Sequence, residues 1–154
     1  MKVKKYYPIL VHMIVCVCWY VLNLLFFIGP EPGILTQYVY NCIEQQLATV
    51  MMTIVVVAGL SVTFCAYFSV GKQIRNIDLT DKIKIVLSVI FFNLLIFLIL
   101  VICTQNINAA IYYSQFTFNA PFFVLLTQSN LSKILSLIIF SITPSIIICF
   151  GAIS

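Results

Sequence analysis

Four long runs of apolar residues constrain the fold of this chain more than any other feature of its sequence. They cover residues 8–28, 47–70, 83–103 and 131–152, and the charged residues within them, Lys84 and Lys133, lie close to the ends of their runs. An α-helix rises about 1.5 Å per residue, so about 20 apolar residues cross the hydrocarbon core of a bilayer. We therefore predict four transmembrane helices.

The composition excludes the usual soluble classes. Of the 154 residues, 63% are hydrophobic and 8% are charged, and the mean hydropathy is +1.16. A soluble domain is about 45–50% apolar and about 25% charged, because charged side chains must cover its surface. These values exclude a soluble globular enzyme and a disordered tail, and they predict a polytopic membrane protein.

Helix-breaking residues separate the runs. Two prolines and two glycines within residues 29–33 end the first run, and Gly71 is expected to stop the second with a left-handed turn. Asp78 and Asp81 precede the third run, where acidic side chains suit a helix N-terminus. Pro144 is expected to kink the fourth. The predicted fold is all-α, a single domain over residues 1–154 with four transmembrane helices and a long uncharged loop before the last.

The distribution of basic residues predicts the orientation. Lys2, Lys4 and Lys5 precede the first run, and four more basic residues lie between the second and third, at Lys72, Arg75, Lys82 and Lys84. Cytoplasmic segments are enriched in Lys and Arg. We therefore expect both termini in the cytoplasm, with Lys133 at the outer mouth of the fourth helix.

A fifth span over residues 109–127 is the alternative topology. It would place Lys133 in the cytoplasm and the C-terminus outside. Polar residues at Ser114, Gln115, Thr117 and Asn119, together with Pro121, oppose it, because polar groups at that depth are costly without partners. We prefer an outer loop in the headgroup zone, anchored by its Tyr and Phe side chains.

The chain lacks the residue patterns of membrane enzymes. The sequence has no H-E-x-x-H, no G-x-S-x-G and no C-x-x-C, and its one histidine, His12, has no acidic neighbour. We interpret His12 as an interfacial residue near the cytoplasmic end of the first helix. We predict a non-enzymatic protein with no cofactor, no metal and no nucleic-acid partner, and the net charge of +4 is explained by membrane topology.

Helix–helix contact is the remaining chemistry that the sequence offers. Asn23 and Asn93 are the strongest polar residues within the runs, and a hydrogen bond from either to another helix is worth about 0.6–2 kcal/mol. Gly59 and Thr63 form a small-xxx-small pattern, used for internal packing or for docking a foreign helix. The candidate residues for partner contact are Asn23, Gly59, Asn93, Tyr112, Tyr113, Phe116 and Phe118.

Two of the six cysteines are candidates for a disulfide. In the four-helix topology Cys42 and Cys103 both lie on the outer side, where an oxidising compartment permits a bond. The bond would tie the first outer loop to the end of the third helix. The alternative leaves both thiols unbonded. Cys16, Cys18, Cys65 and Cys149 lie within the runs and are expected to pack as small apolar residues.

The layout resembles the four-helix immunity proteins that protect bacteria against pore-forming colicins, in particular the colicin A group. The resemblance lies in the chain length, in the basic segment that begins Gly71-Lys72-Gln73-Ile74-Arg75, and in the long outer segment from Phe116 to Asn130. It is a resemblance of layout and carries no sequence motif. It implies a protein that recognises the apolar helical hairpin of a toxin within the bilayer.

A second interpretation places the chain in a larger assembly. An accessory subunit of a membrane transport or secretion complex would use the same polar and small residues in a permanent helix–helix interface. The expected partners are therefore the lipid bilayer and either a pore-forming toxin or another membrane protein.

Overall fold

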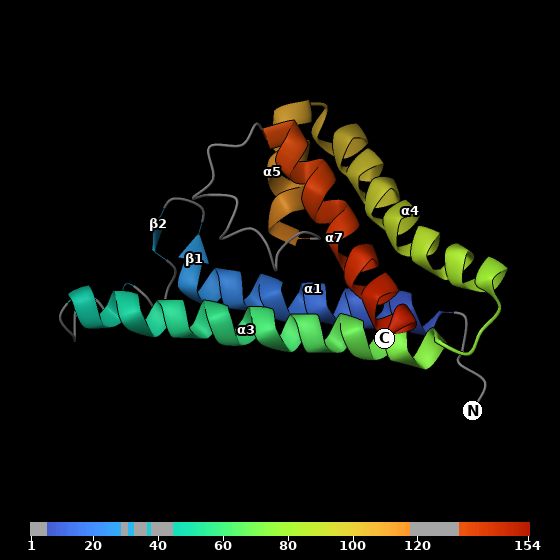
Figure 1. The fold of residues 1–154 in the computed structure, drawn as a ribbon. Helices are drawn as coiled ribbons and strands as arrows, with labels where there is room; N and C mark the ends of the chain where they lie inside the picture. Colours follow the sequence, from blue (N-terminus) through green and yellow to red (C-terminus); the bar gives the residue numbers. More distant parts are fainter. Residues whose placement is uncertain (1–5, 29–30, 33–36, 38–44, 118–132) are drawn as a thin grey trace.

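The computed structural model describes residues 6–28, 31–32, 37, 45–117 and 133–154. This part of the chain is helical, apart from a ladder of two short strands (Figure 1). The helices are α1 (Tyr7–Phe26), α3 (Gln45–Ile74), α4 (Leu79–Thr104), α5 (Ile107–Thr117) and α7 (Lys133–Ile153). The strands β1 (Phe27–Ile28) and β2 (Glu31–Pro32) pair antiparallel directly after α1. The all-helical prediction is therefore confirmed in its coarse form.

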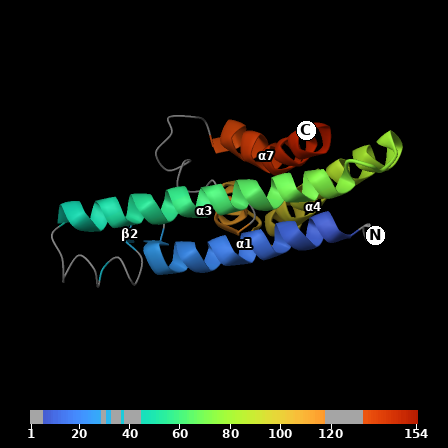
Figure 2. The same cartoon turned by 60° about the horizontal axis from the view of Figure 1, so that its bottom comes forward.

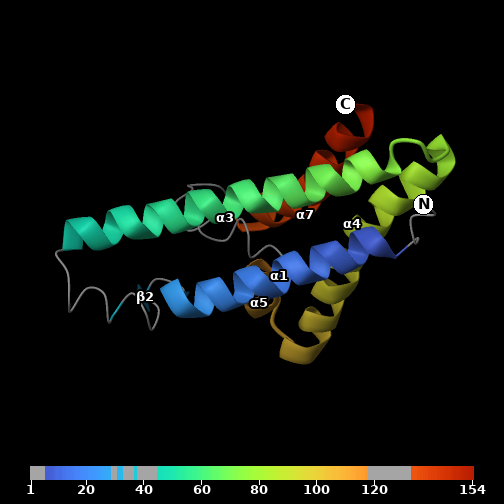
Figure 3. The same ribbon diagram turned by 90° about the horizontal axis from the view of Figure 1, so that it is seen from below.

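Helices α1 and α3 lie side by side and run in opposite directions (Figures 1 and 3). The contact depends on a small residue in α3. A Cβ added at Gly59 would lie 2.8 Å from the Trp19 ring, so the indole of α1 packs directly on the glycine. The Trp19 ring N–H donates a 2.7 Å hydrogen bond to the Thr63 hydroxyl, one turn along α3. Gly59 and Thr63 therefore serve internal packing, because Trp19 of the same chain contacts both residues.

Helices α4, α5 and α7 form a second group beside this pair (Figure 2). Helix α4 ends in a left-handed turn at Gln105, with φ of 50°. Asn106 then caps α5, because its side-chain oxygen accepts from the backbone N–H groups of Asn108 and Ala109. Helix α5 folds back along α4 and buries Ala110, Ile111 and Ser114, residues spaced for one helical face.

The apolar core lies at one end of the molecule, where four helix ends meet. Tyr67, Val70 and Ile74 of α3 pack there with residues near the start of α4 and the end of α7, namely Ile85, Val89, Ile147 and Ile148. Tyr7, Val11 and Val15 cover this cluster from the beginning of α1. The start of α1 and the C-terminus therefore lie at the same end of the molecule (Figure 1).

Helices α3 and α7 cross at two glycines. A Cβ added at Gly71 would collide with the Ile148 carbonyl oxygen and would lie 2.7 Å from the Gly151 Cα. A Cβ added at Gly151 would collide with the Phe68 carbonyl oxygen. The two backbones are therefore in direct contact, which only residues without a side chain permit.

Three helices are long and apolar enough to cross a membrane, over Tyr7–Leu25, Thr49–Ile74 and Leu79–Thr104. Helix α7 contributes a shorter apolar segment, Ser141–Ile153. Many large apolar side chains on these helices are exposed, among them Val17, Ile54, Val62, Phe91 and Ile102. Apolar surface on this scale requires a lipid environment, since water would penalise it. These features indicate a membrane protein.

Two local predictions are wrong. Gly71 does not end its helix, because α3 continues to Ile74 and uses the glycine for the α7 contact. The segment expected to be an outer loop contains α5, and Phe116 and Thr117 lie in the last turn of that helix. At 11 residues α5 is about 16 Å long, which is too short to span a bilayer, and residues 118–127 of the alternative fifth span lie outside the described residues.

Candidate functional site

His12 lies at the centre of a buried polar cluster. The side chain is fully buried, and both ring nitrogens are within hydrogen-bonding distance of another helix. Nδ1 lies 2.8 Å from the Tyr67 hydroxyl of α3, and Nε2 lies 2.8 Å from the Asn93 Oδ1 of α4. One imidazole thus joins three helices.

Asn93 extends the cluster to a fourth helix. Its side-chain Nδ2 donates to the Ser141 carbonyl oxygen of α7 at 3.2 Å. Because a carbonyl can only accept, this bond places the amide nitrogen toward α7 and the amide oxygen toward His12. The Nε2 of His12 must therefore carry a hydrogen, which it donates to Asn93. We call His12, Tyr67, Asn93 and the Ser141 carbonyl the polar node.

The node corrects the interpretation of His12 as an interfacial residue without a task. His12 is one turn and a half into α1, about 8 Å from Tyr7, and the neighbouring helices enclose it completely. The Phe92 ring meets it edge to face at 6.1 Å between centroids, and the Cys16 sulfur lies 3.8 Å from Nε2. A polar side chain in this environment is stable only when its hydrogen bonds are made.

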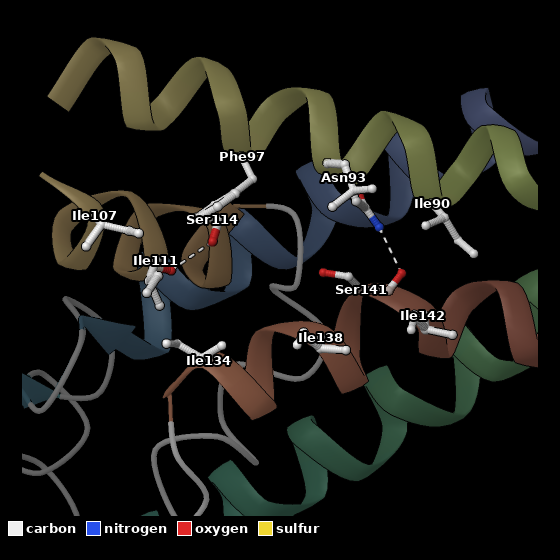
Figure 4. A pocket seen from close by; sticks show the side chains of 11 residues that line it. Ile90, Asn93, Phe97, Ile107, Ile111, Ser114, Ile134, Ile138, Ser141 and Ile142 are labelled. Atoms are coloured by element: carbon white, nitrogen blue, oxygen red, sulfur yellow. Dashed lines mark hydrogen bonds between the residues drawn. The ribbon is translucent and has the colours of Figure 1, made fainter. Parts of the chain in front are cut away.

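A pocket of about 380 Å³ lies beside the node, between α4, α5 and α7 (Figure 4). Its volume falls in the range of about 300–1,000 Å³ that is typical of ligand pockets. Among the described side chains, those that line it carry no charge. They are Ile90, Asn93, Leu94, Phe97, Ile107, Ile111, Ser114, Ile134, Ile138, Ser141 and Ile142.

The pocket walls carry polar groups at defined positions. Asn93 is 5% exposed and Ser114 is 3% exposed, and both side chains line the pocket. Figure 4 shows the bond from Asn93 to Ser141 and the bond from the Ser114 hydroxyl to the Ile111 carbonyl oxygen. Asn93 therefore belongs both to the node and to the pocket wall.

The predicted contact residues lie in different places. Asn93 is in the node, whereas Asn23 is buried three turns further along α1, about 16 Å from His12, so the two asparagines do not bond each other. Gly59 is covered by Trp19. Tyr112 and Tyr113 are exposed on α5 and meet edge to face at 5.7 Å.

The remaining predicted residues lie partly outside the described residues. Phe116 belongs to α5, but its side chain is outside them, as is all of Phe118. Cys103 is exposed near the end of α4, and Cys42 falls in the undescribed 38–44 segment. The Cys42–Cys103 disulfide therefore stays a prediction.

Sequence reasoning missed Tyr67, Ser114 and Ser141. Tyr67 and His12 face each other across the α1–α3 contact, and their polarity within apolar runs was the available signal. Ser141 contributes its backbone carbonyl, which no side-chain pattern predicts. Within the described ranges no three His, Cys, Asp or Glu side chains gather as metal ligands.

Comparison with protein-family models, with curated proteins and with solved structures found no match to this chain. The function must therefore be argued from the polar node, the pocket and the lipid-exposed surface.

Proposed function

We propose that α1, α3, α4 and α7 all cross the membrane and that the end of the molecule holding the core faces the cytoplasm. The basic residues Lys72, Arg75, Lys82 and Lys84 lie at or near this end, around the turn between α3 and α4, and all but the half-buried Lys82 are exposed. Cytoplasmic loops carry such an excess of basic residues. Both termini would then be cytoplasmic, in a bacterial inner membrane, with α5 dipping back into the bundle from the outer side.

Within this topology we propose a non-enzymatic function, which is recognition of another membrane helix. The occupant would be the hairpin of a pore-forming bacteriocin, and the chain would act as its immunity protein. The observation that carries the proposal is the pocket between α4, α5 and α7, whose described lining is uncharged and largely apolar and includes the fixed amide of Asn93. A helix entering from the outer face would meet this pocket and α5 together.

The exposed residues around the pocket support recognition within the bilayer. Leu94, Ile134 and Ile138 line the pocket and are more than half exposed, so their side chains can contact a helix that approaches through the lipid. Between apolar helices in lipid, packing and a few hydrogen bonds provide the affinity. Such recognition needs no catalytic group and no cofactor.

A challenge assay tests the proposal. The chain is expressed alone in sensitive cells, and these are exposed to the pore-forming toxin whose gene lies beside this one. We expect survival well above that of cells with the empty vector. Survival equal to the empty vector, or a gene neighbourhood without a toxin, would contradict the immunity function.

Two neighbouring isoleucines of α7 provide a matched pair of variants for this assay. Ile138 lines the pocket and is 51% exposed, whereas Ile139 is 41% exposed and lies outside the pocket lining. Ile138→Trp would fill the pocket and is expected to abolish protection. Ile139→Trp adds the same bulk toward lipid and is expected to protect like the wild type.

The exposed N-terminal half of α3 supports the second candidate, an accessory subunit of a membrane transport or secretion complex. Leu47, Val50, Ile54 and Val57 are all more than half exposed, and they offer a long apolar face to another protein. A subunit would co-purify with stoichiometric partners from its native membrane and would confer no protection. Purification of the chain without such partners, together with protection, would exclude this candidate.

A further inference from the structure

The pocket between α4, α5 and α7 contains hydrogen-bonding capacity that the chain itself does not use. The Asn93 amide nitrogen has two hydrogens, and the bond to the Ser141 carbonyl uses one of them. Its second hydrogen has no partner among the residues that the structure describes. The Ser114 oxygen donates to the Ile111 carbonyl and keeps its lone pairs available.

The Asn93 amide is held in a fixed orientation. The His12 Nε2 donates to its oxygen at 2.8 Å, and its nitrogen donates to α7 at 3.2 Å. These two hydrogen bonds prevent the amide group from rotating toward another hydrogen-bond partner. A fixed amide on a side chain that is 95% buried and lines an apolar cavity favours a ligand that supplies an acceptor there.

We propose that this pocket binds a neutral amphiphile dissolved in the bilayer, which is an apolar molecule that carries a carbonyl or hydroxyl oxygen. The ligand oxygen accepts from Asn93, and a hydroxyl, where the ligand has one, donates to Ser114. The apolar body contacts the isoleucines of α5 and α7, notably Ile107, Ile134 and Ile138. The described lining side chains carry no charge and so offer no countercharge to an ionic headgroup.

This proposal does not rest on the immunity function, because the ligand occupies the pocket in membranes without toxin; a toxin helix that docks there would compete with it. Two classes of membrane lipid carry such an oxygen on an apolar body. A quinone carries ring carbonyls, and a diacylglycerol carries ester carbonyls with a hydroxyl. Hexadecane is the matched apolar molecule without an oxygen.

The test uses the full chain in phosphatidylcholine nanodiscs with ¹⁵N-labelled asparagine. Decylubiquinone, dioctanoylglycerol and hexadecane are titrated separately, and the side-chain amide signal of Asn93 is followed by NMR. We expect a saturable change with at least one oxygen-bearing probe and none with hexadecane. The probe that gives a saturable change shows whether the natural ligand is a quinone or a diacylglycerol.

Two pairs of variants localise the binding. Ile138→Trp and Leu94→Trp should abolish the saturable change, because both side chains line the pocket from different helices. Ile139→Trp and Leu95→Trp, their neighbours outside the lining, should retain it. A linear response to every probe, an equal response to hexadecane, or equal behaviour of all four variants would each overturn the proposal. Cells could still be protected in any of these cases, so the two proposals fail separately.

Discussion

The crossing of α3 and α7 gives the most sharply defined perturbation, Gly71→Ala. An ordinary Cβ contact begins at 3.4 Å, whereas the added Cβ would lie 2.7 Å from the Gly151 Cα, so the backbones must separate by at least about 0.7 Å. The Ile148 carbonyl oxygen is closer still and is also backbone, so no side-chain rotation relieves the collision.

Two opposing effects decide how much Gly71→Ala changes the free energy of unfolding. Alanine favours a helix over glycine by about 1 kcal/mol, which stabilises the variant. Against this, overpacking costs about 1–3 kcal/mol, and the separation also loosens Val70, Ile74 and Ile148 in the core. Because backbone atoms cannot move aside, we take the upper part of this range, about 2–3 kcal/mol, and subtract the gain from alanine. The net loss in the free energy of unfolding is then about 1–2 kcal/mol, which lowers the folding constant roughly five- to thirtyfold.

Reversible unfolding in mixed micelles measures this loss. Ser69→Ala is the matched control, because Ser69 is exposed and lies two residues away on the same helix. The control should unfold like the wild type. If Gly71→Ala proved as stable as Ser69→Ala, the direct backbone contact between α3 and α7 would be wrong.

Three further predictions concern the helix contacts and the topology. Gly59→Ala should cost less than Gly71→Ala in the same unfolding assay, because the added Cβ meets the Trp19 ring, a side chain that can shift; an equal or larger cost would oppose this reasoning. Thr63→Val removes the acceptor of the indole N–H and should shift the fluorescence emission of Trp19, the chain's single tryptophan, whereas Val62→Thr on the exposed face should leave the spectrum unchanged. Reporter fusions should place the C-terminus and the α3–α4 turn on the same side of the membrane, and an external signal from the C-terminal fusion alone would favour five spans.

The apolar runs predicted the main helices because length and hydropathy alone decide whether a helix can cross a bilayer. The first predicted run, 8–28, overlaps α1 almost completely, and 83–103 lies within α4. Helix ends were harder to predict. Gly71 was interpreted as a helix stop because glycine adopts left-handed conformations. In the structure it instead allows α3 and α7 to come into backbone contact, because it has no side chain. The sequence alone does not distinguish these two roles of a glycine.

The site was less predictable because it depends on which helix faces meet. Asn93 was identified by its polarity within an apolar run, and it does bond to two other helices. His12 was judged by its distance from the helix end, which says nothing about burial inside a bundle. Its partner Tyr67 is 55 residues away, and only the packing of α1 on α3 and α4 brings the node together.

Polar side chains buried between the helices hold α1, α3, α4 and α7 together. A double-mutant cycle on His12 and Asn93 measures this contribution, with the wild type, His12→Leu, Asn93→Leu and the double variant compared by unfolding in mixed micelles. We expect the double variant to lose about 0.6–2 kcal/mol less than the two single losses combined, because each single change already breaks the shared bond. Losses that simply add would show that the His12–Asn93 contact contributes nothing to the fold.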